Sequence, residues 1–268
     1  MAKTLVDEIE YMKLYILDNG WMECDENWIV CLNSYKTKTN REATSRWIKI
    51  PVYCVLIDTG NEKILFDTGQ NPNEYDRSIR CPYYYKEEQL LINQLKSLHL
   101  DPSDIDKVIL SHFHDDHCGN MDMFKSAEFY IAQDEYDYVK KALENHQKPK
   151  GAYKYAHLNI EKIHLVKEDI KIHDHIQLIN LPGHSKGLLG MIVHLEKEGT
   201  LLFPSDAVDT HLNYGPPAMP QYSQYNLEKY YESIEKVRNL QERLNAKIIF
   251  SHDMEQFMTL KKAPDYYE

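Results

Sequence analysis

Residues 107–117 read KVILSHFHDDH, an apolar run followed at once by three histidines and two aspartates. The apolar part predicts a buried strand, and the polar part predicts a tight loop at its end. Because successive side chains leave a strand end in different directions, His112 and His114 can bind one cation while Asp116 and His117 face a second. Solvated histidines in a surface loop are the alternative, but they would not explain four metal-type residues at these spacings. The stretch therefore predicts a two-metal site.

Further donors are expected downstream, because a pair of divalent ions needs more ligands than this loop supplies. Three metal-type side chains each follow a short apolar run, namely His184, Asp206 and His252. Ligands at strand ends sit on rigid elements and can meet at one edge of a sheet. We therefore expect these three residues to complete the site.

These motifs together resemble the metallo-β-lactamase superfamily, specifically the branch of the N-acyl-homoserine lactonases and 4-pyridoxolactonase. The resemblance extends from about Lys13 to about Phe257 and rests on HFHDDH at 112–117, GHS at 183–185, Asp206, SHD at 251–253 and DTG at 67–69. It implies an α/β fold, an αβ/βα four-layer sandwich with a dinuclear zinc site at the shared edge of two sheets. Manganese, cobalt or iron would be substitutes for zinc.

The resemblance also implies how the donors are shared. The first zinc takes His112, His114 and His184, the second takes Asp116, His117 and His252, and Asp206 bridges the two. A carboxylate suits the bridge because its two oxygens can hold two cations about 3.5–4 Å apart. Asp67 resembles a buried acidic residue of the superfamily, which we expect to hold a metal-bound histidine rather than the metal itself.

Such a site is expected to open a small lactone ring, for example that of a quorum-sensing N-acyl-homoserine lactone. Two divalent ions lower the pKa of a shared water, so a bridging hydroxide is available near neutral pH as the nucleophile. Asp116 is the candidate that carries a proton to the departing ring oxygen.

The expected substrate positions depart from the resembling lactonases. Those enzymes have a tyrosine three residues after the bridging aspartate, where this chain has Asp209, and an aromatic or apolar residue where it has Asp115. Two carboxylates would suit a substrate that bears an amine. Alternatively, both are solvated or paired with local Lys or Arg, as most acidic side chains are. Tyr214 is a candidate replacement for the missing phenol, with a rim or packing role as its alternative.

Other functions share part of this motif. A glyoxalase II-like thioesterase would need basic residues for a glutathione carboxylate, and another small cyclic ester or amide hydrolase would use the same ions. An iron-dependent persulfide dioxygenase binds one iron through two histidines and one aspartate. A metal-stabilised binding protein without activity is disfavoured by the complete ligand set.

Charge and composition restrict the partners and the location. The net charge of −11 disfavours nucleic acid as a partner. No export signal or uncharged apolar run of membrane length occurs, so we expect a cytoplasmic protein without a membrane partner. The five cysteines lack CxxC spacing and predict no disulfide framework, and Cys118 is not expected to bind zinc. By analogy with the resembling lactonases, we expect a homodimer.

Alternating strand and helix patterns predict α/β layers in a single domain over residues 1–268, with residues 1–12 as an N-terminal extension. The predicted strands are 13–18, 48–58, 62–67, 107–111, 127–132, 161–166, 176–181, 188–195, 200–204 and 247–250. The predicted helices are 87–98, 133–144 and 226–244, the last with Asn226 as its N-cap.

Overall fold

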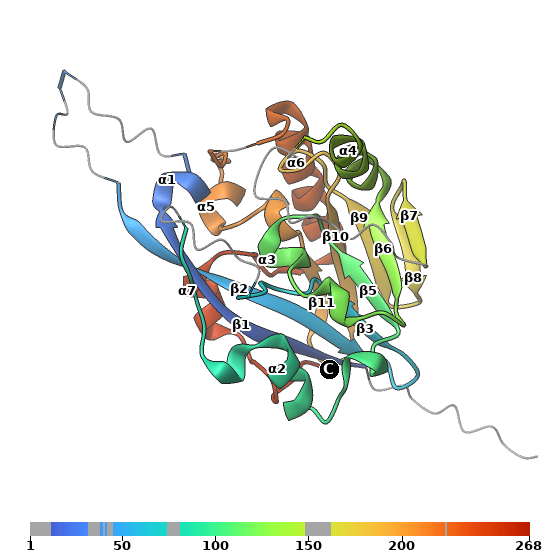
Figure 1. Ribbon diagram of the computed structural model, residues 1–268. Helices are drawn as coiled ribbons and strands as arrows, with labels where there is room; N and C mark the ends of the chain where they lie inside the picture. Colours follow the sequence, from blue (N-terminus) through green and yellow to red (C-terminus); the bar gives the residue numbers. More distant parts are fainter. Residues whose placement is uncertain are drawn as a thin grey trace, which may run out of the picture.

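Most of the apolar segments that the sequence marks as strands lie in two mixed β-sheets, as the computed structural model in Figure 1 shows. The structure describes residues 12–31, 38–39, 41, 45–73, 81–147, 162–222 and 224–268. The predicted N-terminal extension falls outside these residues except for Met12, which packs in the core.

The first sheet has seven strands in the order β4-β1-β2-β3-β5-β6-β7. Their bounds are Lys13–Asp25 (β1), Trp47–Asp58 (β2), Lys63–Phe66 (β3), Tyr83–Tyr84 (β4), Lys107–Leu110 (β5), Glu128–Ala132 (β6) and Ile163–Val166 (β7). β1, β2 and β3 pair antiparallel, whereas β3, β5, β6 and β7 pair in parallel. The parallel strand β5 is almost wholly apolar because both of its faces are buried.

The second sheet has five strands in the order β12-β11-β10-β9-β8. Their bounds are Ile170–His173 (β8), Ile176–Asn180 (β9), Leu189–Leu195 (β10), Gly199–Phe203 (β11) and Lys247–Ile248 (β12). The pairs are antiparallel except for β11 with β12, which run in parallel.

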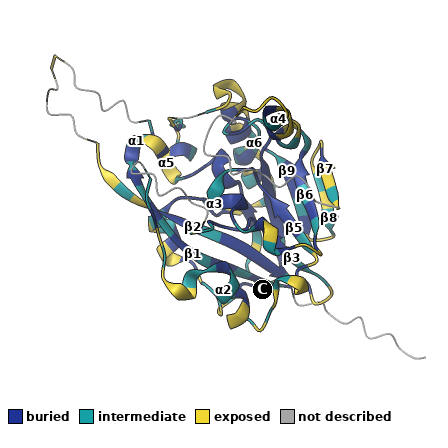
Figure 2. Ribbon diagram, viewed as in Figure 1, coloured by how far each residue is buried: buried dark blue, intermediate teal, exposed yellow. Residues whose placement is uncertain are grey.

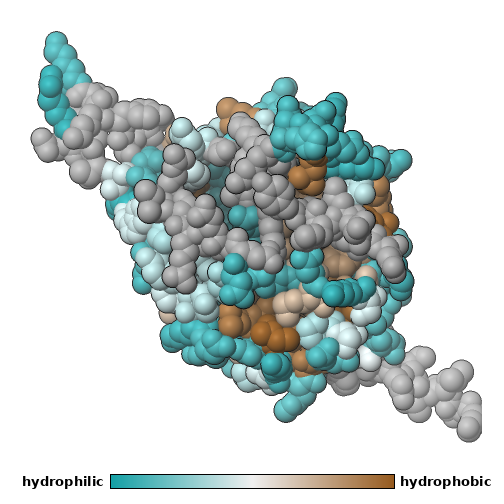
Figure 3. Space-filling view, viewed as in Figure 1, coloured by the Kyte–Doolittle hydropathy of each residue, from teal (hydrophilic) through white to brown (hydrophobic). Residues whose placement is uncertain are grey.

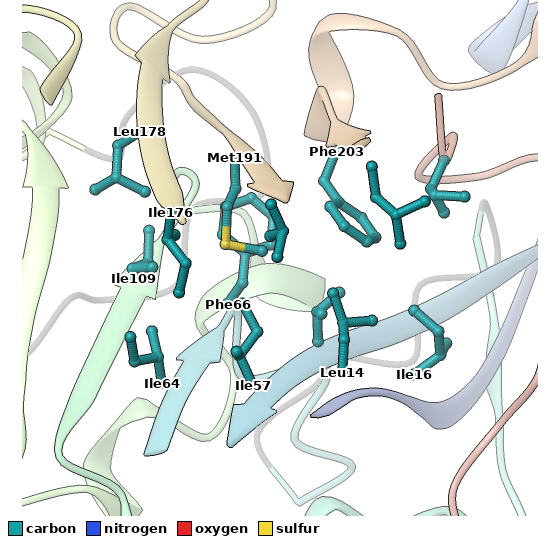
Figure 4. Close-up of a cluster of buried hydrophobic side chains, with 14 of the residues drawn as sticks. Leu14, Ile16, Ile57, Ile64, Phe66, Ile109, Ile176, Leu178, Met191 and Phe203 are labelled. Atoms are coloured by element: carbon teal, nitrogen blue, oxygen red, sulfur yellow. The ribbon is translucent and has the colours of Figure 1, made fainter. Parts of the chain in front are cut away.

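The two sheets pack face to face around the largest apolar core. Figure 4 shows Ile109 and Ile57 of the first sheet pointing toward Leu178 and Met191 of the second. α2 (Leu91–Ser97) and α4 (Gln133–Glu144) pack against the outer face of the first sheet, and α6 (Leu227–Leu244) packs against the second. The order helix, sheet, sheet, helix confirms the predicted four-layer sandwich.

Helix α6 shows how the local sequence sets this packing. Asn226 caps it, since its side chain accepts a hydrogen bond from the backbone N–H of Lys229 at 2.9 Å. Tyr230, Ile234 and Val237 recur at helical spacing and bury one face against the second sheet. The backbone N–H of Asn226 also donates to the carbonyl of Gly183 at 2.9 Å, which ties the helix start to the loop after β9.

Several observed elements differ from the predicted ones. The predicted helix 87–98 is a 3₁₀ turn at Glu87–Gln89 followed by α2, because the extended backbone of Leu90 separates them. The predicted strand 247–250 is only β12, since the N–H of Phe250 donates instead to the Gln256 side chain at 2.8 Å. Short elements without a predicted counterpart are β4, β8, α1 (Glu26–Ile29), α3 (Asp115–Cys118), α5 (His211–Tyr214) and α7 (Met254–Thr259).

The buried strands lie between helices whose outer sides are exposed (Figure 2). The described part of the face in Figure 3 is largely hydrophilic, with small apolar patches. Across the described ranges, none of the helices combines the length and the apolar character that crossing a membrane would require.

Candidate metal centre

The seven predicted ligands come from four loops that follow strands of the two sheets. His112 and His114 follow β5, and the short helix α3 then carries Asp116 and His117. The other three ligands follow β9, β11 and β12 and are His184, Asp206 and His252. The structure brings the donor atoms of all seven into two adjoining clusters.

The first cluster contains His112, His114, His184 and Asp206, whose donor atoms all lie within 4.8 Å of one another. His184 Nε2 is 2.9 Å from His114 Nδ1 and 3.4 Å from Asp206 Oδ2. His112 Nε2 is 3.7 Å from the same Asp206 Oδ2. Three imidazoles and one carboxylate oxygen form a donor set that zinc accepts.

The second cluster contains Asp116, His117 and His252, again with donor atoms within 4.8 Å. Asp116 Oδ2 lies 3.5 Å from both His117 Nε2 and His252 Nε2. The other oxygen of Asp206, Oδ1, lies 3.2 Å from His117 Nε2 and 3.3 Å from His252 Nε2. The two oxygens of Asp206 thus face different clusters, as a bridging carboxylate requires.

The unsatisfied polar atoms of the site fit a pair of cations. Among the described residues, His112 Nε2, His117 Nε2 and Asp206 Oδ1 are buried and make no hydrogen bond. Buried polar atoms without a partner are costly and are rare in folded proteins. A divalent ion in each cluster would satisfy all three atoms at once, so these residues fit a pair of bound metal ions.

Partners outside the clusters fix the imidazole rings. Asp67 Oδ2 accepts from His117 Nδ1 at 2.8 Å, and Asp67 also accepts from the backbone N–H and the hydroxyl of Ser111. The carbonyl of Pro51 accepts from His252 Nδ1 at 3.0 Å. With Nδ1 engaged, Nε2 of each ring is left for an ion. The contact of Asp67 agrees with the supporting role expected for it.

Gln221 is a residue that sequence reasoning missed. Its side-chain oxygen accepts a hydrogen bond from His184 Nδ1, and its amide nitrogen donates to the carbonyl of Asp206 at 2.9 Å. It therefore connects His184 of the first cluster to Asp206, whose two oxygens face the two clusters. Nothing in its neighbourhood in the sequence marks it, because Gln221 lies in an irregular segment without a motif.

The electrostatics of the two clusters differ. Burial and neighbouring histidines hold the pKa values of His112 and His114 well below the usual range. Burial alone would also lower the pKa of His252, but the nearby carboxylates, Asp206 foremost, raise it to about 10. The pKa of His117 is raised for the same reason. Burial acts to raise the pKa of Asp206, yet His117 and His252 hold it well below its usual range, so the bridge is ionised.

The candidate substrate residues lie in three environments. Asp115 is half-buried at the start of α3. Asp209 is 2% exposed and accepts a hydrogen bond from the Ser251 hydroxyl at 3.3 Å. The alternative that Asp209 is solvated is therefore wrong, because its side chain is buried. The Tyr214 hydroxyl bonds to Gln241 of α6 and its ring packs near Arg238, contacts that agree with its packing alternative.

Cys118 lies outside both clusters. It is buried in the apolar core beneath the first sheet, together with Phe113 and Met121. The metal-type groups found among the described residues do not include it. All five cysteines of the chain are described, and none forms a disulfide.

Comparisons with known proteins give a family match and relatives of nearly full length. Residues 47–252 match the model of the Metallo-beta-lactamase superfamily. The chain is 32% identical to N-acyl homoserine lactonase AiiB of Rhizobium rhizogenes, over 96% of this chain and 99% of the relative. It is 25% identical to N-acyl homoserine lactonase AiiA of Bacillus thuringiensis subsp. kurstaki, over 88% and 94%.

A solved structure shares the fold. It is that of an N-acyl homoserine lactone hydrolase with the product N-hexanoyl-L-homoserine bound at its catalytic metal center. The TM-score is 0.81 at 23% identity, with 95% of this chain and 98% of the other covered.

Proposed function

Because the chain belongs to the metallo-beta-lactamase superfamily, we propose that it is a dinuclear zinc hydrolase that opens a lactone ring. The observation that carries the proposal is Asp206, whose two oxygens each face one cluster of histidines. This arrangement suits two ions that share Asp206 as a bridging ligand. The substrate class is proposed from the relatives, which are named N-acyl homoserine lactonases.

The bound ions would activate a water as the nucleophile and polarise the lactone carbonyl. The protein supplies the alignment: His112, His114 and His184 would hold the first ion, and Asp116, His117 and His252 the second. Of the two carboxylates Asp116 and Asp206, Asp116 is the more accessible, since its side chain is 12% exposed and that of Asp206 is 5% exposed. It is therefore placed to receive a proton and pass it to the departing ring oxygen.

An N-acyl-homoserine lactone, hydrolysed in a quorum-quenching reaction, is the proposed substrate. A buried Asp209 stands where the resembling lactonases have a tyrosine, so this chain would contact the lactone without that phenol. Amine-bearing lactones belong in the test as well, because Asp115 and Asp209 stand where the resembling lactonases have apolar or phenolic groups.

We also propose a cytoplasmic homodimer without nucleic-acid or membrane partners. Five cysteines without a disulfide are typical of a reducing compartment, and the relatives provide the analogy for a dimer. Sedimentation at micromolar concentration tests the oligomeric state, and a monomer would contradict that part of the proposal.

The decisive assay is a substrate panel with zinc-loaded protein, scored by proton release. The panel contains acyl-homoserine lactones, a γ-butyrolactone, a pyridoxolactone, an amine-bearing lactone and glutathione thioesters. We expect lactone hydrolysis that falls by about 10³-fold or more in His112→Ala, since this change removes a metal ligand. His194→Ala is the matched control, because His194 of β10 hydrogen-bonds Thr200 of β11, outside both clusters. Activity on thioesters alone would replace the lactonase proposal with the thioesterase.

A further inference from the structure

Asp209 is a buried carboxylate that the two-ion scheme leaves without a role. It is 2% exposed, and the Ser251 hydroxyl donates to its Oδ1 at 3.3 Å, a long hydrogen bond. Among the described residues, no lysine or arginine forms an ion pair with it. A buried carboxylate normally has a cation or several strong donors as partners.

The position of Asp209 indicates which cation would pair with it. One of its carboxylate oxygens lies within 4.8 Å of donor atoms of both Asp206 and His252. His252 belongs to the second cluster, and Asp206 Oδ1 faces that cluster at 3.3 Å. Asp209 therefore lies beside Asp206 and His252, two of the residues that border the second metal position.

The backbone holds Asp209 at this position. The N–H of His252 donates to the carbonyl of Asp209 at 2.9 Å, which ties the loop after β11 to the loop after β12. Asp209 also follows Asp206 by three residues, so both carboxylates come from one short loop that begins with the 3₁₀ turn Ser205–Ala207. A shift of either loop would move a ligand and Asp209 together.

We propose that Asp209 is a further carboxylate donor to the second metal position. This assignment of Asp209 depends on the proposed function only because both require two bound ions. The second position then has three carboxylates, Asp116, Asp206 and Asp209, beside the imidazoles of His117 and His252. The residue at the position of the tyrosine of the resembling lactonases would thus bind the metal. A site with several oxygen ligands accommodates ions that take five or six ligands.

Equilibrium dialysis of the purified protein against buffered zinc measures the affinity for each ion. We expect Asp209→Asn, which removes the charge and keeps the shape, to weaken the second ion about 10–100-fold and leave the first unchanged. Asp253→Asn is the matched control. Asp253 is also a buried aspartate near the site, 5% exposed, in the loop after β12, but its carboxylate accepts from His211 and the N–H of Gln256. We expect this control to bind both ions as the wild type does.

The visible absorption spectrum of bound cobalt distinguishes a direct ligand from a carboxylate that acts on the ion only through its charge. A Co²⁺ ion with fewer ligands absorbs visible light more strongly, so loss of a direct ligand should intensify the spectrum of the second ion in Asp209→Asn. Asp209→Tyr, which introduces the phenol of the resembling lactonases, should give the same result if Asp209→Asn does not fold. Wild-type zinc affinities and an unchanged cobalt spectrum in the folded variant would overturn the proposal. A wild type that binds two ions yet hydrolyses no lactone would count against the proposed function alone.

Discussion

At the residue scale, Asp67 shows how a side chain outside the clusters controls a ligand within one. Its backbone has a φ of 63°, a left-handed conformation that Asp and Asn tolerate better than most residues. Its carboxylate accepts from His117 Nδ1 and twice from Ser111. The strained backbone therefore aims one carboxylate at the ring that must present Nε2 to the second ion.

Asp67→Asn tests this role without disturbing the backbone. An amide oxygen accepts from His117 Nδ1 more weakly than a carboxylate does, so the ring is a less basic and less firmly oriented ligand, and the second ion should bind about 10–100-fold more weakly. Competition with a chromogenic chelator measures the affinity. Asp58→Asn is the control, since Asp58 is a partly buried aspartate that caps the Gly60 turn at 2.9 Å. Equal affinities in the wild type and Asp67→Asn would contradict the supporting role.

Proton release on metal binding follows from the pKa directions of the ligands. Carboxylates raise the pKa of His117 and bring that of His252 to about 10, so at pH 7 both rings hold a proton before metal binds. The lowered pKa values of His112 and His114 leave those rings neutral. These two rings should contribute about two protons to the release on metal binding at pH 7, and fewer as the pH rises toward 10. Calorimetry in buffers of different ionisation enthalpy counts them, and a release near zero at pH 7 would refute the assignment.

That the seven candidate ligands lie together could be predicted from the sequence, whereas most of their hydrogen-bond partners could not. His112, His184 and His252 each stand in a short motif after an apolar strand, and that pattern is local. The partner of His252 is the carbonyl of Pro51, 201 residues away, and a backbone oxygen has no sequence signature. The burial of Asp209 was missed because it depends on the contact between two loops.

At the scale of elements, the loop after β9 depends on its close approach to helix α6. Gly183 has a φ of 140°, and a Cβ at this position would lie 2.3 Å from the backbone nitrogen of Tyr230. The loop can therefore present His184 to the first cluster only because the preceding residue has no side chain.

Gly183→Ala and Gly60→Ala together separate close packing from backbone strain. Gly60 also has a positive φ, of 90°, but nothing lies within 4 Å of its added Cβ. Both changes strain the backbone, while Gly183→Ala adds a clash worth about 1–3 kcal/mol. The melting temperature of Gly183→Ala should therefore fall below that of Gly60→Ala by about 2–4 °C for each kcal/mol of the clash. Only Gly183→Ala should also bind the first ion more weakly. Equal effects of the two variants would show that the approach to α6 is unimportant.

Long helices and strands were predicted more accurately from the sequence than short ones. α6 was predicted to within a residue because an N-cap and a long periodic apolar face agree. α3 was expected to be a loop, since its four residues DDHC carry no periodicity. The same brevity explains why β8 and α7 have no predicted counterpart.

At the scale of the whole molecule, the candidate site joins the two sheets. β5 of the first sheet leads to His112 and α3, while β9, β11 and β12 of the second lead to the other three ligands. Metal bound at this junction would connect both halves of the sandwich and satisfy the buried atoms between them.

Removal of metal should therefore destabilise the entire fold. An ion at 100 times its Kd adds about 2.7 kcal/mol, so a chelator should lower the melting temperature by roughly 5–10 °C for each site emptied. Calorimetry with and without chelator measures the shift, with zinc added back as the control. A melting temperature that does not respond to the chelator would contradict the connecting role.

Anomalous X-ray scattering from crystals of the zinc-loaded protein is the most direct test of the two-ion site. The account predicts two zinc peaks about 3.5–4 Å apart, one beside each carboxylate oxygen of Asp206. A single peak, or peaks away from Asp206, would contradict it.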